Sequence, residues 1–267
     1  VVLSKGSEPP TESANPTGDE FWESLQVPPD MNGEKIQGKF GASVSMNSDG
    51  TRMVIGSPGV VGNIVDQSIQ RGIVSVYDRT EEGWTKVQDI PLTAREDEIT
   101  FKPMREVRSD LVVDISRDGN KIAVGAPFHD ALNQTDIGQV EVFSHDGGKW
   151  KANGAPLTGK RNGELFGASV SLSKDGLMLA IGMPGKGEDG KQSGAASVYL
   201  FNDGNWDRLG AQDIVGGSKG QMLGGSVSLS SDGFTVAVGS SATSASTNTE
   251  VANAYEFKGG NWKELGT

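Results

Sequence analysis

The sequence predicts an all-β fold, a β-propeller of four-stranded antiparallel blades with four repeats. Three observations predict it: an Asp-Gly pair recurs four times, apolar runs of strand type flank each pair, and all five tryptophans share one phase of the repeat. The Asp residues of the four pairs are 69, 57 and 57 residues apart, at Asp49, Asp118, Asp175 and Asp232. The first repeat therefore carries an insertion.

Each repeat begins with an alternating strand that runs into a tight turn. Alternation of apolar and polar residues with period two is typical of a half-buried strand. At the turn, Gly takes a positive φ angle and Asp bonds its own backbone, so the strands before and after the pair form a hairpin. The four alternating segments, each including its Asp-Gly pair, are 40–50, 109–119, 166–176 and 223–233.

Three further strands complete each blade. A short, continuously apolar run follows each turn, at 52–58, 121–127, 177–184 and 234–240, and indicates a strand covered on both faces. A third strand follows a polar loop, at 72–78, 138–144, 195–202 and 251–257. The fourth strand begins at a Trp, at Trp84, Trp150, Trp206 and Trp262. We interpret the in-phase Trp residues as packing anchors of the outer strands rather than as cofactor-stacking rings.

The repeat resembles the FG-GAP propeller family, whose familiar member is the integrin α-subunit head. The resemblance covers about residues 21–267 and rests on Phe40-Gly41, Phe166-Gly167 and Gly125-Ala126-Pro127. The second repeat departs from it, with Ser109-Asp110 in place of Phe-Gly, and the fourth has Gly239-Ser240-Ser241 in place of Gly-Ala-Pro. The resemblance would imply calcium in the first turn, but this turn has a single Asp and calcium prefers about six to eight oxygen ligands. The family's calcium sites are therefore not carried over.

The two ends raise a question of ring closure. Residues 1–20, rich in Pro, Ser, Thr and Glu, predict an extended or disordered arm, and 21–267 form the propeller. Five Trp strands do not divide among four blades. Residues 21–27 could complete the last blade beside 251–257, or the chain could be cut at Thr267 from a larger ring. We expect four blades.

Composition bounds the partners and the compartment. The formal net charge of -11 and the pI near 4.7 disfavour nucleic acid and anionic membranes. No apolar stretch reaches the roughly 20 residues that span a bilayer. The sequence has no Cys and starts at Val1 rather than Met, which suggests a removed signal or transit peptide. We therefore expect a secreted or organelle-lumen protein without membrane insertion.

Few residues suggest chemistry. His129 and His145 lie in a loop and a turn without a GxSxG elbow, so no catalytic residue and no cofactor are assigned. The carboxylates Asp130, Asp136, Glu188 and Asp189 in Gly-rich loops could bind calcium, but their spacing matches no calcium loop, and we assign no metal site. Asn133 begins a glycosylation sequon.

These features predict a non-catalytic, non-enzymatic binding or scaffold module. Its partner would be a protein, such as an extracellular adhesive ligand or a subunit of a larger complex. The contacts are expected in the loops that break the repeat, namely 59–71, 91–109, 128–137 and 185–194. The alternatives are a carbohydrate-binding propeller and a polymer-hydrolysing enzyme. An Asp that recurs in every blade is explained by its turn, whereas a catalytic residue would more often break the repeat.

Overall fold

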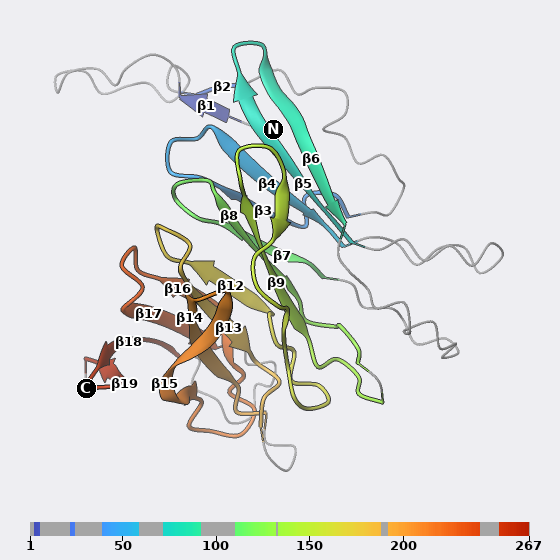
Figure 1. Ribbon diagram of the computed structural model, residues 1–267. Coiled ribbons are helices and arrows are strands. Elements are labelled where there is room, and N and C mark those ends of the chain that lie inside the picture. The colour runs from blue at the N-terminus through green and yellow to red at the C-terminus, as the bar shows by residue number, and fades with distance from the viewer. Residues whose placement is uncertain are drawn as a thin grey trace.

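The computed structural model describes residues 3–5, 22–24, 39–58, 72–91, 110–131, 133–187, 192–240 and 251–266. This part of the chain is all β and contains a two-stranded sheet and four larger antiparallel sheets, each of which follows the chain from one strand to the next (Figure 1). The prediction of a β-propeller with four four-stranded blades is confirmed. We number the sheets blades 1 to 4 in chain order.

The strands fall close to their predicted places. Blade 1 holds β3 (Ser43–Met46), β4 (Arg52–Ser57), β5 (Ile73–Thr80) and β6 (Gly83–Pro91). Blade 2 holds β7 (Val112–Ile115), β8 (Lys121–Ala126), β9 (Gln139–His145) and a fourth strand in two pieces, β10 (Trp150–Ala152) and β11 (Leu157–Thr158). Blade 3 holds β12 (Ser169–Leu172), β13 (Met178–Met183), β14 (Ala195–Asn202) and β15 (Asn205–Val215). Blade 4 holds β16 (Leu223–Leu229), β17 (Thr235–Ser240), β18 (Ala252–Lys258) and β19 (Asn261–Leu265).

The recurring Asp closes the turn between the first two strands of each blade. In blade 2, Asp118 Oδ1 accepts the backbone N–H of Asn120 at 3.0 Å and the hydroxyl of Ser116 at 2.5 Å. The next residue, Gly119, has φ 74°, a left-handed conformation that a side chain would strain. The other three turns repeat the Asp-to-backbone bond. The in-phase Asp residues are therefore turn residues, as predicted.

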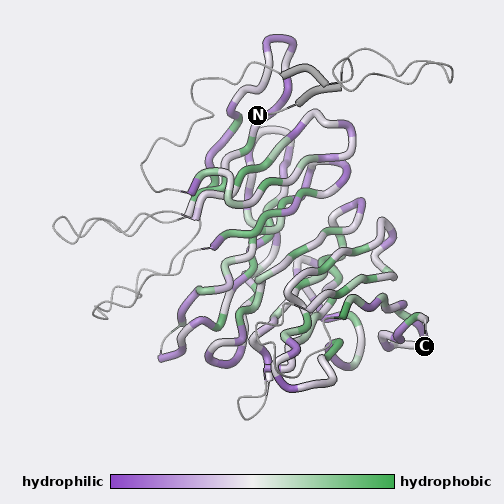
Figure 2. The backbone as a smooth tube through the Cα atoms, turned by 180° about the vertical axis from the view of Figure 1, so that it is seen from behind, coloured by the Kyte–Doolittle hydropathy of each residue, from purple (hydrophilic) through white to green (hydrophobic). Residues whose placement is uncertain are grey.

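The apolar core lies between neighbouring blades, and Trp residues anchor it. Figure 2 shows hydrophobic segments along the stacked strands and hydrophilic ones at the turns. Trp84, Trp150 and Trp206 are buried, and Trp206 Nε1 donates to the carbonyl of Asn153 in the preceding blade at 2.8 Å. Trp262 Nε1 donates to the Leu209 carbonyl in the same way at 3.1 Å. These four Trp residues are packing anchors, as predicted.

The fifth Trp strand does not complete the last blade. Strand β2 (Trp22–Ser24) pairs antiparallel with β1 (Leu3–Lys5), and β19 takes the outer place beside β18. Of the two alternatives for the fifth Trp strand, the one in which 21–27 completes blade 4 does not hold for its described residues, 22–24. Its physical reason is local: Gly259 and Gly260 both have positive φ and turn the chain tightly from β18 into β19. Strand β1 lies within the predicted arm, and the rest of 1–20 lies outside the described residues.

A ladder of side chains joins the first strands of successive blades. Strands β3, β7, β12 and β16 lie side by side, and we call them the inner strands. At one position of an inner strand, a Ser or Asp side chain accepts a backbone N–H from the next blade: Ile115 to Ser45 at 3.3 Å, Leu172 to Asp114 at 2.7 Å, and Leu229 to Ser171 at 3.0 Å. We call these bonds the inter-blade ladder. The polar half of the alternating pattern therefore faces the next blade as well as solvent.

The blades form an arc. Blade 1 lies at one end and blade 4 at the other, with blades 2 and 3 between them (Figure 1). The inner strands of neighbouring blades pack against each other, β3 against β7, β7 against β12 and β12 against β16. In blade 2, the loop that follows the second strand contacts the segment that follows the fourth strand, where the Gly163 N–H donates to the Thr135 carbonyl at 2.9 Å.

Candidate functional site

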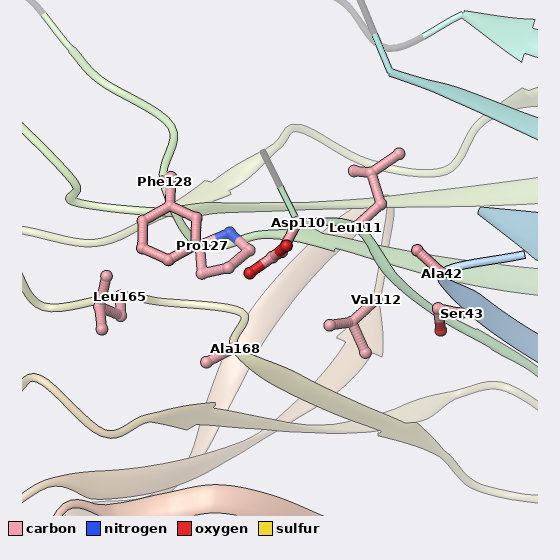
Figure 3. Close-up of a pocket in the computed structure, with 9 residues that line it drawn as sticks. All are labelled: Ala42, Ser43, Asp110, Leu111, Val112, Pro127, Phe128, Leu165 and Ala168. Carbon is pink, nitrogen blue, oxygen red and sulfur yellow. The ribbon is translucent and has the colours of Figure 1, made fainter. Parts of the chain in front are cut away.

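A pocket of about 320 Å³ lies where three inner strands begin. Blades 1, 2 and 3 all contribute to it, so three separate repeats build one site (Figure 3). Its lining residues are Ala42, Ser43, Asp110, Leu111, Val112, Pro127, Phe128, Leu165 and Ala168. Ligand pockets for small molecules start at about 300 Å³, so this volume suits a small ligand.

Asp110 is the ionisable residue of this lining, and it stands where the repeat has Gly. The equivalent residues of the other blades are Gly41, Gly167 and Gly224, all with positive φ. A Cβ added to Gly224 would lie 2.1 Å from the Ala195 carbonyl oxygen, and one added to Gly167 would lie 2.7 Å from a Val140 methyl. Blades 3 and 4 therefore leave no room for a side chain at this place, whereas blade 2 presents a carboxylate there.

The Asp110 carboxylate faces both the pocket and a cation. Figure 3 shows its oxygens projecting between Pro127 and Val112. Lys39 Nζ lies 3.7 Å from Asp110 Oδ1, and the two side chains are 57% and 59% exposed. An exposed pair of this kind contributes only about 0–1 kcal/mol to stability. Both side chains are therefore more than half exposed to solvent.

Ser43 supplies a hydroxyl on the wall that blade 1 contributes. Its Oγ accepts the backbone N–H of Val113 at 3.0 Å, which fixes the oxygen between blades 1 and 2. A hydroxyl that accepts one bond still has its own proton to donate. The pocket therefore combines a carboxylate, an ammonium group beside it and a hydroxyl donor.

The opposite wall is apolar and held by backbone bonds. Phe128 and Leu165 lie together on this side of the pocket (Figure 3). Phe128 starts the loop at 128–137, whose ends are joined by the Gly138 N–H bond to the His129 carbonyl at 3.1 Å. Leu165 N–H donates to the Asp136 carbonyl at 3.1 Å, which ties this loop to the connection between blades 2 and 3. The wall is thus positioned by two segments that brace each other.

The residues considered as calcium ligands either bond within the loop at 128–137 or lie outside the described residues. Asp130 Oδ1 accepts the Asp136 backbone N–H at 2.7 Å and so closes the loop at 128–137. Glu188 and Asp189 lie outside the described residues. In the part of the chain that the structure describes, no three His, Asp or Glu side chains are grouped as metal ligands would be.

The two histidines lie outside the set of residues that line the pocket. His129 follows Phe128 in the loop, and His145 ends β9 with its ring 5.2 Å from that of Trp150. The sequon residue Asn133 is exposed beside a tight turn in which Ala131 and Gln134 exchange two backbone hydrogen bonds. Of the four predicted contact loops, 59–71 lies outside the described residues. The loop 91–109 also lies outside them, except for Pro91, the last residue of β6.

Other charged groups hold the loops around the pocket. Lys186, in the loop after β13, pairs with Asp213 on β15 and lies 3.5 Å from Glu164. Glu164 is buried and also accepts the Lys160 backbone N–H at 2.6 Å. Hydrogen bonds from Lys186 and Ser197 hold the pKa of Asp213 below its usual value, although burial acts against them. Every charge of this cluster has a partner, so the cluster is structural.

Sequence reasoning noted Ser109-Asp110 as a departure from the repeat but gave Asp110 no role. The available signal was the rule that a catalytic residue more often breaks the repeat. Asp114 is a second departure in the same repeat, with Asp where the other blades have Ser45, Ser171 and Ser228. The pocket itself had no signal, because its walls come from residues far apart in sequence.

Comparison with known proteins gives structural matches only. No protein-family model matches the sequence, and no curated protein is similar to it. The periplasmic gluconolactonase of Pseudomonas aeruginosa is similar in structure, with a TM-score of 0.58 and 12% identity over 94% of this chain. The chain spans 61% of the length of that enzyme. A structure assigned as a 6-phosphogluconolactonase from Bacteroides uniformis matches with a TM-score of 0.49, 12% identity, and 85% and 71% of the two chains. A structure assigned as TolB from Agrobacterium tumefaciens matches with a TM-score of 0.43 and 13% identity. The match covers 84% of this chain and 61% of that one.

The first match shows the propeller fold and corrects the predicted function. The sequence predicted a non-catalytic, non-enzymatic scaffold because its residues conform to a repeat, yet a propeller that overlaps most of this chain is a lactonase. Conformity to a repeat therefore does not indicate a chain without an activity. The similarity to FG-GAP repeats stays a prediction.

No helix among the described residues is long and apolar enough to cross a membrane.

Proposed function

We propose that this chain is a hydrolase that opens a small lactone or ester bound in the Asp110 pocket. The observation that carries the proposal is the placement of Asp110: the carboxylate that replaces a repeat Gly lies in the lining of the pocket. The gluconolactonase of similar fold supports the reaction class. Propellers host many unrelated activities, so the residues of the site, rather than the fold, define the test.

The pocket holds groups suited to attack by water on a carbonyl carbon. The Asp110 carboxylate would take a proton from a water molecule while the water oxygen bonds to the carbonyl carbon. The electron pair of the C=O bond moves to the oxygen, where the Lys39 ammonium group and the Ser43 hydroxyl would stabilise the negative charge. Collapse of this intermediate breaks the ring C–O bond, and the leaving alkoxide takes back the proton held by Asp110.

The charge and size of the site favour a neutral, compact substrate. A pocket of about 320 Å³ suits a ligand the size of a single sugar ring. The chain has a net charge of -11 and its pocket presents a carboxylate, so a phosphorylated substrate would be repelled. The apolar wall at Phe128 and Leu165 would cover one face of the ring. We propose an unphosphorylated sugar lactone as the substrate.

The test measures the hydrolysis of neutral and phosphorylated δ-lactones. The reaction is monitored through the acid that it releases in weakly buffered solution. The rate above spontaneous hydrolysis is the quantity of interest. Asp110→Asn should lower it by about 100-fold or more, because general-base catalysis contributes about 10²–10⁴-fold. Asp207→Asn is the matched control, since Asp207 is an exposed carboxylate on β15 outside the pocket lining. Wild-type protein that gives no acceleration with any lactone, or Asp110→Asn that keeps the full rate, refutes the proposal.

An exported location is part of the proposal. It is supported by the periplasmic location stated for the similar gluconolactonase and by the sequence prediction of a removed targeting peptide. We also propose that the chain binds a protein partner, independently of the hydrolase activity.

A further inference from the structure

The two ends of the arc present the two halves of one interface. Inside the chain, each inner strand gives its Ser or Asp side chain to the next blade and receives the apolar side chains and N–H groups of that blade. This exchange occurs at all three junctions between blades. It defines what the outgoing side of blade 4 and the incoming side of blade 1 should meet.

The outgoing side of blade 4 is open. Ser226, Ser228 and Ala237 are exposed. Their counterparts in earlier blades are covered: Ser169 is 8% exposed, and Ala123 and Ala180 are 0% exposed. Ser228 stands at the ladder position occupied by Ser45, Asp114 and Ser171. Its hydroxyl oxygen accepts no backbone N–H among the described residues, so the ladder has an unused acceptor here.

The incoming side of blade 1 is open along its inner strand. Val44 is 60% exposed and Met46 is 43% exposed. Their counterparts in the middle blades are buried at 5% for Val113, 5% for Ile115, 8% for Val170 and 8% for Leu172. The N–H of Met46 is the equivalent of the Ile115 N–H that donates to Ser45. Strand β3 therefore offers apolar side chains and an N–H that no described residue accepts, and β16 offers a serine to which no described N–H donates.

We propose that a second copy of this chain docks head to tail, with its β3 packed beside β16 of the first copy. The Met46 N–H of one copy would donate to Ser228 of the other, and Val44 and Met46 would cover Ala237 and Ser226. The interface extends the ladder by one more step, because β3 carries the same alternation as the strands already joined in this way. It does not rest on the proposed hydrolase activity.

The docking is confined to the inner strands. Met53, Ile55, Tyr77 and Trp84 on the incoming side of blade 1 are already buried, at 0% to 6% exposed. A full blade-to-blade contact would use these residues, whereas the second copy meets only the strand edge. The association is therefore weaker than the contacts inside the chain and depends on concentration. A head-to-tail contact closes into a ring when the rotation between copies closes, and in the proposed pair each of the two copies uses both of its ends.

Sedimentation velocity on the unmodified chain over a range of concentrations tests the association. The mass should rise from one copy to two as concentration increases. Val44→Glu should abolish this rise, because a carboxylate would be buried without a partner. Val215→Glu is the matched control: Val215 is 62% exposed on β15 of blade 3, outside β3 and β16, and the variant should associate like wild type. A chain that stays monomeric, or a Val44→Glu variant that associates normally, overturns the proposal.

Cysteine cross-linking identifies the contact, since the chain has no Cys of its own. Ladder side chains of neighbouring blades touch, as Ser45 Oγ and Asp114 Oδ1 do at 2.8 Å. Under mild oxidation, a mixture of Ser228→Cys and Ser45→Cys chains should form a mixed disulfide dimer. A mixture of Ser228→Cys with Val215→Cys should give at least tenfold less. Equal yields from the two mixtures would overturn the proposed geometry.

Discussion

Asp114 offers a test of the inter-blade ladder. Its Oδ1 accepts the Ser45 hydroxyl of blade 1 at 2.8 Å, and its Oδ2 accepts the Leu172 N–H of blade 3 at 2.7 Å. Asp114→Ala removes both acceptors and leaves two donors without partners at the blade junctions. An unsatisfied donor in a buried place costs about 1–3 kcal/mol, so we expect a loss of about 2–4 kcal/mol of unfolding free energy.

Asp114→Asn separates the hydrogen bonds from the charge. Burial raises the pKa of Asp114 above its usual value, and its hydrogen bonds only partly offset this effect. A raised pKa in the folded state means that Asp114 stabilises the fold most below the unfolded carboxyl pKa of about 3.9 and loses this contribution as pH rises through the folded value. The amide of Asn keeps an acceptor for Leu172 and carries no charge. Asp114→Asn should therefore stay within about 1 kcal/mol of wild type and gain on it as pH rises.

Urea unfolding followed by Trp fluorescence measures both effects between about pH 4 and pH 8. The exposed Asp207→Ala serves as the control and should change unfolding free energy by less than about 0.5 kcal/mol. If Asp114→Ala unfolded like this control, the ladder would contribute nothing to stability. If Asp114→Asn lost stability relative to wild type with rising pH, the assigned cause of the pKa shift would be wrong.

Two further predictions concern the Trp anchors and the sequon. Trp206→Ala should lower unfolding free energy by about 3–5 kcal/mol, because it empties a buried site and leaves the Asn153 carbonyl without its donor. Trp262→Ala, on the less buried end blade, should cost less in the same urea experiment, and equal losses would contradict the anchoring role. Asn133 should carry an N-glycan when the chain is secreted from a eukaryotic host, since it is exposed beside a tight turn. A glycosidase-sensitive mass that disappears in Asn133→Gln would confirm it, and an unmodified secreted chain would refute it.

The repeat predicted the strands and turns because each rests on local rules. Period-two alternation, the Asp-Gly turn at Gly119 and the Trp that opens each outer strand act within a few residues of themselves. The ladder could not be predicted in this way. Alternation predicts which side chains point to one side of the strand. It does not predict that Ser45 accepts the N–H of Ile115, 70 positions later in the sequence.

The site was harder to predict than the fold, since it depends on assembly across blades. Asp110 was visible as a departure from the repeat, but the walls that make it a pocket residue come from Ser43 and Leu165. The fifth Trp strand was misplaced for a similar reason. Its partner, β1, is a three-residue strand in a segment whose composition predicted an arm.

Both departures from the repeat lie at the inner strand of blade 2, and they have different consequences. Asp110 lies two residues before β7 and gives the pocket its carboxylate. Asp114 lies four residues later and, with two acceptor oxygens, bonds blade 1 and blade 3 together, which a Ser at that position does not do in the other blades. The pocket is thus built from the three blades that Asp114 links. A group that acts on a ligand must be held in place by the residues around it. Residues 110–114 therefore supply both the carboxylate of the proposed hydrolase site and the bonds that fix the walls around it.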